Sequence, residues 1–162
     1  MDGQLERLKK YLVDVGAAQL PHAGQKYIDH NVGVYYALKT WGCYAEVCDA
    51  GFLHSIYGTE RFNAFKVATS DRPVIRDLIG ARAEALVYLN CTMERKDFDE
   101  FVLSDVPKEA QDRDLMTIHL ADWLDQVPFS GEWKYRRDVY ESIAEQIGGM
   151  ALSSFKWVYR GH

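Results

Sequence analysis

Cysteine and proline are both scarce in this sequence. Its three cysteines, Cys43, Cys48 and Cys91, are odd in number, and none belongs to a C-x-x-C pair. This argues against a zinc ribbon and against a disulfide framework, so the cysteines are interpreted as small buried residues. The four prolines are spaced like the punctuation between helices.

Long apolar runs and strong net charge are also missing. No run reaches the roughly 18 apolar residues of a transmembrane helix, and the opening "MDGQLERLKKYL" has no signal-peptide core, so a cytoplasmic protein is expected. The formal charge is −5, from 19 basic and 24 acidic residues. That argues against general nucleic-acid binding, which needs a basic surface. It leaves room for a small anionic ligand held by a few arginines or by a metal.

What the sequence does contain is enough apolar material for one helical domain. Its 162 residues are 48% hydrophobic and 13% aromatic, which suits a single domain over 1–162 with a packed core. Apolar residues recur at helical spacing, with glycines at the stops, which predicts an all-α fold. Residues 61–70 are expected to form a loop or an extended piece, and 97–101 a turn of helix or an extended piece. The predicted helices cover residues 3–15, 28–41, 44–55, 71–79, 81–91, 108–127, 132–147 and 150–159.

Three polar residues stand where this pattern calls for apolar ones. His30 lies on the apolar stripe of its helix, and His54 shares a face with small residues that would let a neighbouring helix approach closely. Asp122 lies in the apolar stretch "MTIHLADWLDQV", where a carboxylate is costly unless it is paired or bound to a metal. Side chains that project inward from several helices are the usual way to hold a metal in a helical domain. Two imidazoles and a carboxylate form a partial shell for zinc, iron, manganese or another divalent ion.

Each of these residues also has a purely structural interpretation. A single histidine on an apolar helix is more often a hydrogen-bonded core residue than a metal ligand. A single Asp122 would more often cap a helix or pair with an arginine such as Arg82 or Arg113. The occurrence of all three, on three separate core helices, is what makes a metal site worth testing.

Four segments, taken in order, resemble the HD-domain superfamily. They are "YIDHNVGVYYALKTWG", "VCDAGFLHSIYGTE", "DLIGARAEALVYLNC" and "LMTIHLADWLDQV", and they look most like the hydrolase half of the guanosine tetraphosphate enzymes. His30 matches the first ligand of that family, His54 the histidine of the HD pair, and Asp122 the last aspartate. The resemblance covers residues 20–127 and implies an HD-like helical bundle with a divalent metal, manganese, iron or zinc. The C-terminal helices, 132–159, take no part in it.

The chain also departs from the family pattern beside His54. Ser55 replaces the aspartate of the HD pair, and Gly58-Thr59 replace the Glu-Asp pair that handles the attacking water. The basic segment before the first ligand is missing as well. Hydrolysis of guanosine tetraphosphate itself is therefore not carried over, and the chain is interpreted as a separate branch with "HS" in place of "HD".

Other residues are candidates to complete such a metal site. Glu60 is the candidate general base or extra ligand, and Tyr57 and Ser55 are the other candidate catalytic residues. His22 is a candidate fourth metal ligand, reaching the site from its loop, and His119 shares the approximate helical face of Asp122. The structural alternatives are that Glu60 pairs with a neighbouring arginine or lysine, that His22 is solvated, and that His119 lies on the surface.

The function expected first is metal-dependent hydrolysis. An open-sided ion lowers the pKa of its bound water and polarises a phosphoryl oxygen, and Glu60 would shuttle the proton. Lys26, Arg61 and Lys66 flank the histidine segments and would bind an anionic substrate. The simplest version is a phosphohydrolase of a small phosphorylated metabolite, with no nucleic-acid or membrane partner.

Two alternatives stay open. An HD-type non-heme iron oxygenase acting on a small molecule would use the same two histidines and carboxylate as a facial triad. A degenerate, non-catalytic binding module would explain the loss of the HD aspartate, with the aromatic C-terminal segment as a homo-oligomer interface. The identity of the bound metal separates these interpretations.

Overall fold

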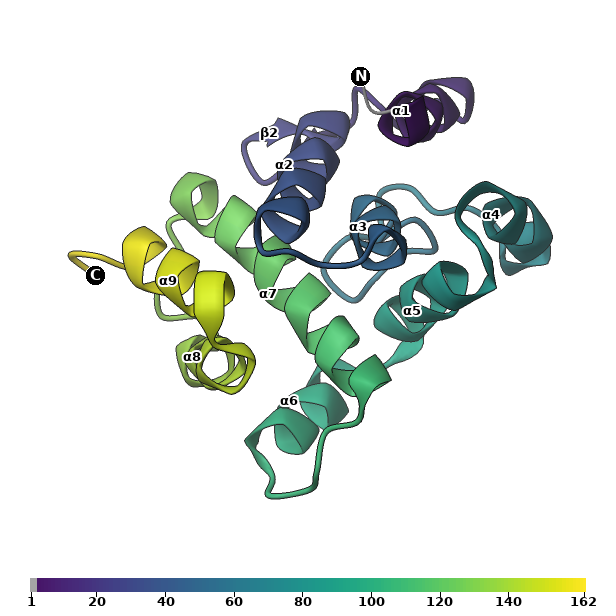
Figure 1. Ribbon diagram of the computed structural model, residues 1–162. Coiled ribbons are helices and arrows are strands. Elements are labelled where there is room, and N and C mark those ends of the chain that lie inside the picture. Colours follow the sequence, from purple (N-terminus) through teal and green to yellow (C-terminus); the bar gives the residue numbers. More distant parts are fainter. Residues whose placement is uncertain (1–2) are drawn as a thin grey trace.

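The computed structural model describes residues 3–162, and their regular structure is almost entirely helical (Figure 1). Met1 and Asp2, the start of the polar N-terminal segment, lie outside the described residues. A 3-10 turn at Thr69–Asp71 precedes α4, and the short strands β1 (Pro21–His22) and β2 (Gln25–Lys26) form an antiparallel hairpin. The predicted all-α fold is confirmed. The helices are α1 (Gly3–Asp14), α2 (Tyr27–Thr40), α3 (Ala45–Phe52), α4 (Arg72–Ile79), α5 (Ala81–Thr92), α6 (Arg95–Leu103), α7 (Ala110–Ser130), α8 (Arg137–Ile147) and α9 (Gly149–Val158).

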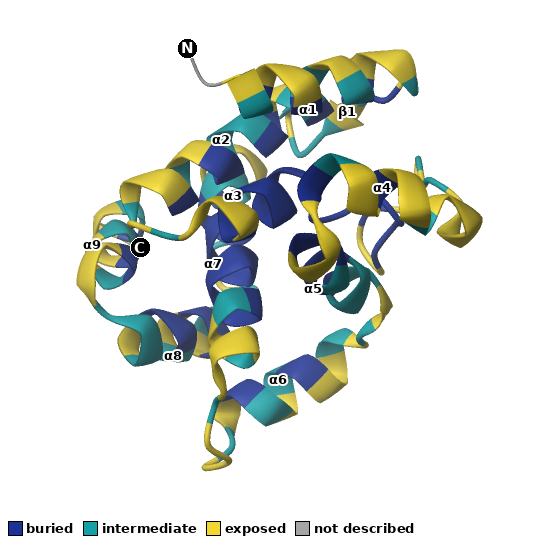
Figure 2. Ribbon diagram, turned by 45° about the vertical axis from the view of Figure 1, so that its right-hand side comes forward, coloured by how far each residue is buried: buried dark blue, intermediate teal, exposed yellow. Residues whose placement is uncertain are grey.

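Helix α7 is the axis around which the other helices pack. It contacts α2, α3 and α5 on one side and α8 and α9 on the other (Figure 1). Every residue from 115 to 124 is buried, and α7 is dark blue through its middle in Figure 2. A helix that is buried all round needs apolar residues on every face. Polar side chains in this stretch are therefore exceptions that require partners.

Helices α2 and α3 approach each other closely because Gly51 has no side chain. A Cβ built on Gly51 would lie 2.1 Å from Cδ1 of Leu38, a distance that no packed core tolerates. The small residues before His54 therefore act as the sequence predicts. The close approach brings the end of α3 beside the first turn of α2, where His30 lies.

Several helix ends differ from the predicted ones. Helix α3 ends at Phe52, so His54 lies in the turn that follows and not in the helix. Helix α7 continues past residue 127 to Ser130 and includes Pro128 in its last turn. It ends at Gly131, whose φ of 70° lies in the left-handed region that glycine adopts without strain.

Two more segments are settled by the structure. Residues 97–101, left open by the sequence, belong to α6. Helix α8 begins at Arg137 and not near 132, because Arg136 has φ 45° and ψ 34°, a left-handed conformation that interrupts the helical path. None of the helices between residues 3 and 162 combines the length and the apolar character needed to cross a membrane.

Candidate metal centre

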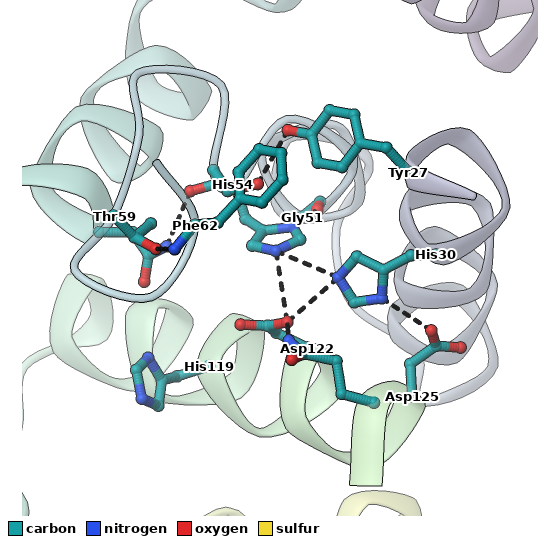
Figure 3. Close-up of polar contacts among 12 residues, drawn as sticks. Tyr27, His30, Gly51, His54, Thr59, Phe62, His119, Asp122 and Asp125 are labelled. Carbon is teal, nitrogen blue, oxygen red and sulfur yellow. Dashed lines mark hydrogen bonds and ion pairs between the residues drawn. The ribbon is translucent and has the colours of Figure 1, made fainter. Parts of the chain in front are cut away.

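His30, His54 and Asp122 converge from three elements (Figure 3). His30 comes from α2, His54 from the turn after α3, and Asp122 from the buried stretch of α7. Nε2 of His30 lies 3.4 Å from Nε2 of His54, and the two nitrogens lie 3.2 and 3.3 Å from Oδ1 of Asp122. Both imidazoles are almost completely buried. The three residues singled out in the sequence therefore form one triangle of nitrogen and oxygen atoms.

The size of this triangle fits a bound transition metal. Ligands about 2.0–2.1 Å from a tetrahedral zinc ion are separated from one another by about 3.4 Å. The three edges of the triangle, from 3.2 to 3.4 Å, lie at or just below that separation. The spacing of the three atoms is thus compatible with three ligands of one tetrahedral site.

The far side of each imidazole is held by an acceptor. Nδ1 of His30 donates to Oδ2 of Asp125 over 2.8 Å, and Nδ1 of His54 donates to the carbonyl oxygen of Gly51 over 2.8 Å. A hydrogen bond donated by Nδ1 fixes the tautomer in which Nε2 carries a free lone pair, and this is the usual arrangement of metal-binding histidines. Two such lone pairs and a carboxylate oxygen repel one another unless a proton or a cation lies between them.

In the absence of a metal, a proton fills this role. Burial disfavours the charged form of His30, but hydrogen bonds to Asp122 and Asp125 outweigh it and raise the pKa of His30 to about 9. Burial likewise opposes ionisation of Asp122, yet the charges and hydrogen bonds of His54 and His30 hold the pKa of Asp122 well below its usual range. Metal binding at such a site displaces the proton.

His22 approaches the triangle from the β1–β2 hairpin. Its ring centroid lies 4.4 Å from that of His30, and ligand atoms of His22, His30 and Asp122 all lie within 4.8 Å of one another. Its Nε2 is buried and has no hydrogen-bond partner. Burial first, and then the neighbouring histidines, lower the pKa of His22 to about 4, so the ring is neutral. His22 is therefore partly buried beside His30, with its Nε2 shielded from solvent, and it stays a candidate fourth donor.

The turn that carries His22 is strained. Ala23 and Gly24 have φ of 45° and 81°, and a two-residue hairpin loop with positive φ at both positions is a type I′ geometry. Alanine enters this region at a cost. The strain sits directly beside a candidate ligand.

A cavity of about 370 Å³ opens beside the triangle. His22, His54 and Asp122 line it, and Gln126, which also lines it, donates to Oδ1 of Asp122. Its wall contains three arginines, Arg61, Arg95 and Arg136. The candidate centre thus opens onto a cavity whose wall contains these arginines together with Glu132.

The candidate catalytic residues are not gathered at this cavity. Ser55 lines it, but its hydroxyl shares a 2.8 Å hydrogen bond with that of Tyr27. The Tyr57 hydroxyl donates to Oε1 of Glu84 over 2.9 Å, outside the cavity. Glu60 is exposed, does not line the cavity, and accepts a hydrogen bond from the backbone nitrogen of Arg95.

The candidate substrate-binding residues divide in the same way. Arg61 lines the cavity, whereas Lys26 and Lys66 are exposed and lie outside its lining. His119 is buried and not on the surface, and Figure 3 shows it apart from the triangle. Burial and nearby arginines hold the pKa of His119 well below its usual value.

The alternative partners considered for Asp122 are engaged elsewhere. Arg82 pairs with Glu46 and Asp114, and Arg113 donates to the backbone oxygen of Gln146. The partners of Asp122 are therefore the two histidines and Gln126.

Three residues of the site were not predicted from the sequence. Asp125 lies three positions after Asp122, so helical spacing would have placed both carboxylates on neighbouring faces of α7. Arg95 and Arg136 gave no comparable signal, because only the fold brings α6 and the start of α8 to the cavity.

Comparison with known families gives one match. A family model described as "Domain of unknown function (DUF6817)" matches residues 11–95, about half of the chain. The matched region includes His22, His30 and His54 and ends before α7, which carries Asp122. No curated protein and no solved structure matches the chain.

Proposed function

The chain belongs to the family described as a domain of unknown function (DUF6817), and we propose that it is a metal-dependent hydrolase of a small phosphorylated metabolite. The observation that carries this proposal is the convergence of three acceptor atoms at 3.2–3.4 Å on one side of an open cavity. His30, His54 and Asp122 are proposed as ligands, with His22 as a fourth donor.

The chemistry follows from an ion held on that side of the cavity. A bound divalent ion such as zinc lowers the pKa of its water to about 7 and polarises a phosphoryl oxygen. A hydroxide generated in this way needs no separate general base. The role first expected of Glu60 as a proton shuttle is therefore left out of the proposal, in keeping with its position outside the cavity.

The remaining walls support a small anionic substrate. A cavity of about 370 Å³ lies at the lower end of the range for small-molecule sites, which is roughly 300–1,000 Å³. The arginines of the wall take over the role expected of Lys26 and Lys66, which are exposed outside the cavity. Arg95, the arginine of this wall that contacts His119, is what favours a phosphate ester over a neutral substrate.

The HD-like interpretation is part of the same proposal. It is supported by the meeting of His30, His54 and Asp122, which are widely separated along the chain. Because Ser55 replaces the aspartate of the HD pair and is bonded to Tyr27, we propose one metal ion and not two. An iron oxygenase is the second candidate, since two histidines and one carboxylate are also the facial triad of non-heme iron.

The test is a metal-reconstitution assay. Metal-free protein is loaded separately with zinc, manganese and ferrous iron, and the release of inorganic phosphate from a panel of phosphate monoesters is measured beside oxygen consumption. We expect metal-dependent phosphate release that falls at least 100-fold in His54→Ala and persists in Lys66→Met, whose side chain is exposed and lies outside the cavity lining. Oxygen consumption confined to the iron form, without phosphate release, would favour the oxygenase. Metal binding with neither activity would favour the non-catalytic module.

A further inference from the structure

The three arginines of the cavity wall differ in what holds them. Arg136 is bound by both carboxylate oxygens of Asp99, with Nε–O distances of 3.1 and 2.9 Å, and it also donates to the Tyr140 hydroxyl. Arg61 pairs with Glu132 over 2.8 Å at the exposed rim. Both charges are therefore already balanced by carboxylates.

Arg95 has no such partner among the residues that the structure describes. Its Nη1 lies 3.1 and 3.3 Å from the two ring nitrogens of His119, and its Nε is buried without a hydrogen-bond partner. A buried N–H group without an acceptor is costly and rare in folded proteins. The guanidinium is thus the one cation of the cavity wall whose side chain contacts no carboxylate.

Arg95 is also held in place from its backbone. It is the first residue of α6, and its backbone N–H donates to Oε1 of Glu60 over 2.8 Å. This hydrogen bond ties the start of α6 to the loop that follows His54. Glu60 thereby fixes the position of Arg95 without entering the cavity.

Arg95 shares its cavity with two of the candidate metal ligands. His119, which the Arg95 guanidinium contacts, lies three residues before Asp122 on α7. Arg95, His54 and Asp122 line the same cavity. A group bound between the ion and Arg95 would touch both.

We infer that Arg95 binds the phosphoryl oxygens of the substrate and that Glu60 is the residue that positions Arg95. The planar guanidinium suits the two-oxygen contact that phosphate groups offer. Because Arg61 and Arg136 already pair with carboxylates, the cavity is assigned to a single phosphoryl group, as in a phosphate monoester. This inference rests on the proposed function, since it assigns a role within the same cavity.

The test measures binding of inorganic phosphate by calorimetry to protein loaded with one equivalent of zinc. Arg95→Met should raise the Kd of phosphate at least tenfold while the zinc content stays unchanged. Lys66→Met is the matched control, because Lys66 is exposed and lies outside the cavity lining. It should leave the Kd of phosphate unchanged.

The role of Glu60 is tested by rescue. Glu60→Ala should raise the Kd of phosphate severalfold, and Glu60→Gln should restore it, because the amide oxygen still accepts from the backbone N–H of Arg95. Circular dichroism confirms that each variant is folded. A merely structural effect of removing the carboxylate charge would not be rescued by glutamine.

The inference is overturned if wild type does not bind phosphate, if Arg95→Met binds it as wild type does, or if Lys66→Met weakens it equally. The proposed function can fail separately. Phosphate bound through Arg95 with no ester hydrolysed in any metal form would remove the hydrolase and keep the assignment of Arg95.

Discussion

Two buried carboxylates, Glu84 and Asp122, are held in opposite ways. Glu84 lies on α5 with its side chain 1% exposed, and it receives hydrogen bonds from Arg72 at 2.6 and 3.0 Å and from the Tyr57 hydroxyl at 2.9 Å. Asp122 on α7 faces the Nε2 atoms of two buried histidines. Both carboxyl groups have pKa values held below the usual range, in each case against the effect of burial.

The two carboxylates differ in the charge of their partners. Arg72 is a permanent cation, so the cluster around Glu84 is complete as it stands and needs nothing further. His30 and His54 are neutral acceptors at Nε2 unless they are protonated, so the cluster around Asp122 is complete only with a proton or a cation. A buried carboxylate is therefore not by itself a sign of a binding site. The sign is a set of partners that neutralise the carboxylate only through a proton, which a metal ion can displace.

Removing Glu84 should affect stability and not metal binding. Glu84→Ala leaves the buried Tyr57 hydroxyl without its acceptor, while the partly exposed Arg72 charge can be solvated, and we expect the free energy of unfolding to fall by about 2 kcal/mol. Urea denaturation measures this, and elemental analysis should show unchanged metal. Glu46→Ala, at the exposed pair with Arg82, is the control and should leave the free energy of unfolding nearly unchanged. Equal losses in the two variants would contradict the account.

Gly33→Ala should weaken metal binding at the candidate centre through Asp125, the hydrogen-bond partner of His30. A Cβ on Gly33 would lie 2.1 Å from Oδ1 of Asp125, which would push that carboxylate away from Nδ1 of His30. Loss of such an orienting partner typically costs about 10–100-fold in metal affinity. Competition with a chelator measures the affinity. Gly3→Ala, where a Cβ meets nothing within 4 Å, is the control, and unchanged affinity in Gly33→Ala would remove Asp125 from the centre.

His119, unlike His30, is a buried histidine whose pKa is lowered, so its contribution to stability should depend on pH in the opposite direction. Its folded pKa is lowered by burial and by Arg95 and Arg136, whereas the unfolded value is about 6.5. The stability that it contributes is therefore present above about pH 6.5 and is lost as the pH falls toward the folded pKa. In metal-free protein, the free energy of unfolding falls between pH 7 and pH 5. We expect this fall to be about 1–2 kcal/mol smaller in His119→Gln than in wild type.

Urea denaturation at each pH gives this difference directly. Because the other histidines are present in both proteins, their contributions cancel in the comparison. Parallel pH profiles for wild type and His119→Gln would show that His119 is not held neutral.

The smallest expected effect is at Ala23, beside His22. Ala23→Asn replaces a residue strained at φ 45° with one that enters the left-handed region more readily, and it creates the favoured Asn-Gly turn with Gly24. We expect the free energy of unfolding to rise by about 1 kcal/mol with no change in metal affinity. Thermal and urea unfolding measure the first and chelator competition the second. A loss of stability would show that the hairpin is not governed by this turn.

The helices and the three central residues were accessible from the sequence for one physical reason. Apolar spacing marks the buried faces, and His30, His54 and Asp122 break that spacing, so they stand out. Pro128 shows the limit of such rules. A proline is expected to end the helix before it, at residue 127, but α7 continues through Pro128 to Ser130. The ends of α3 and α8 depend on local backbone conformations that composition does not encode.

The walls of the cavity could not be predicted in the same way. Arg95 is an ordinary charged residue in the sequence, and only the packing of α6 against α7 gives it a role. Glu60 was expected to be catalytic. Its carboxylate instead accepts a hydrogen bond from the backbone N–H of Arg95, outside the cavity. Contacts between side chains distant in the chain decide these roles, and no local pattern carries them.

The central claim is that the triangle of His30, His54 and Asp122 binds one metal ion. The direct measurement is elemental analysis of protein equilibrated with zinc, manganese or ferrous iron and then desalted. We predict about one ion per chain in wild type and in His119→Gln, and less than about one tenth of that in His54→Ala, because three-point binding is lost. Wild type that retains no ion, or His54→Ala that retains as much as wild type, would contradict the claim.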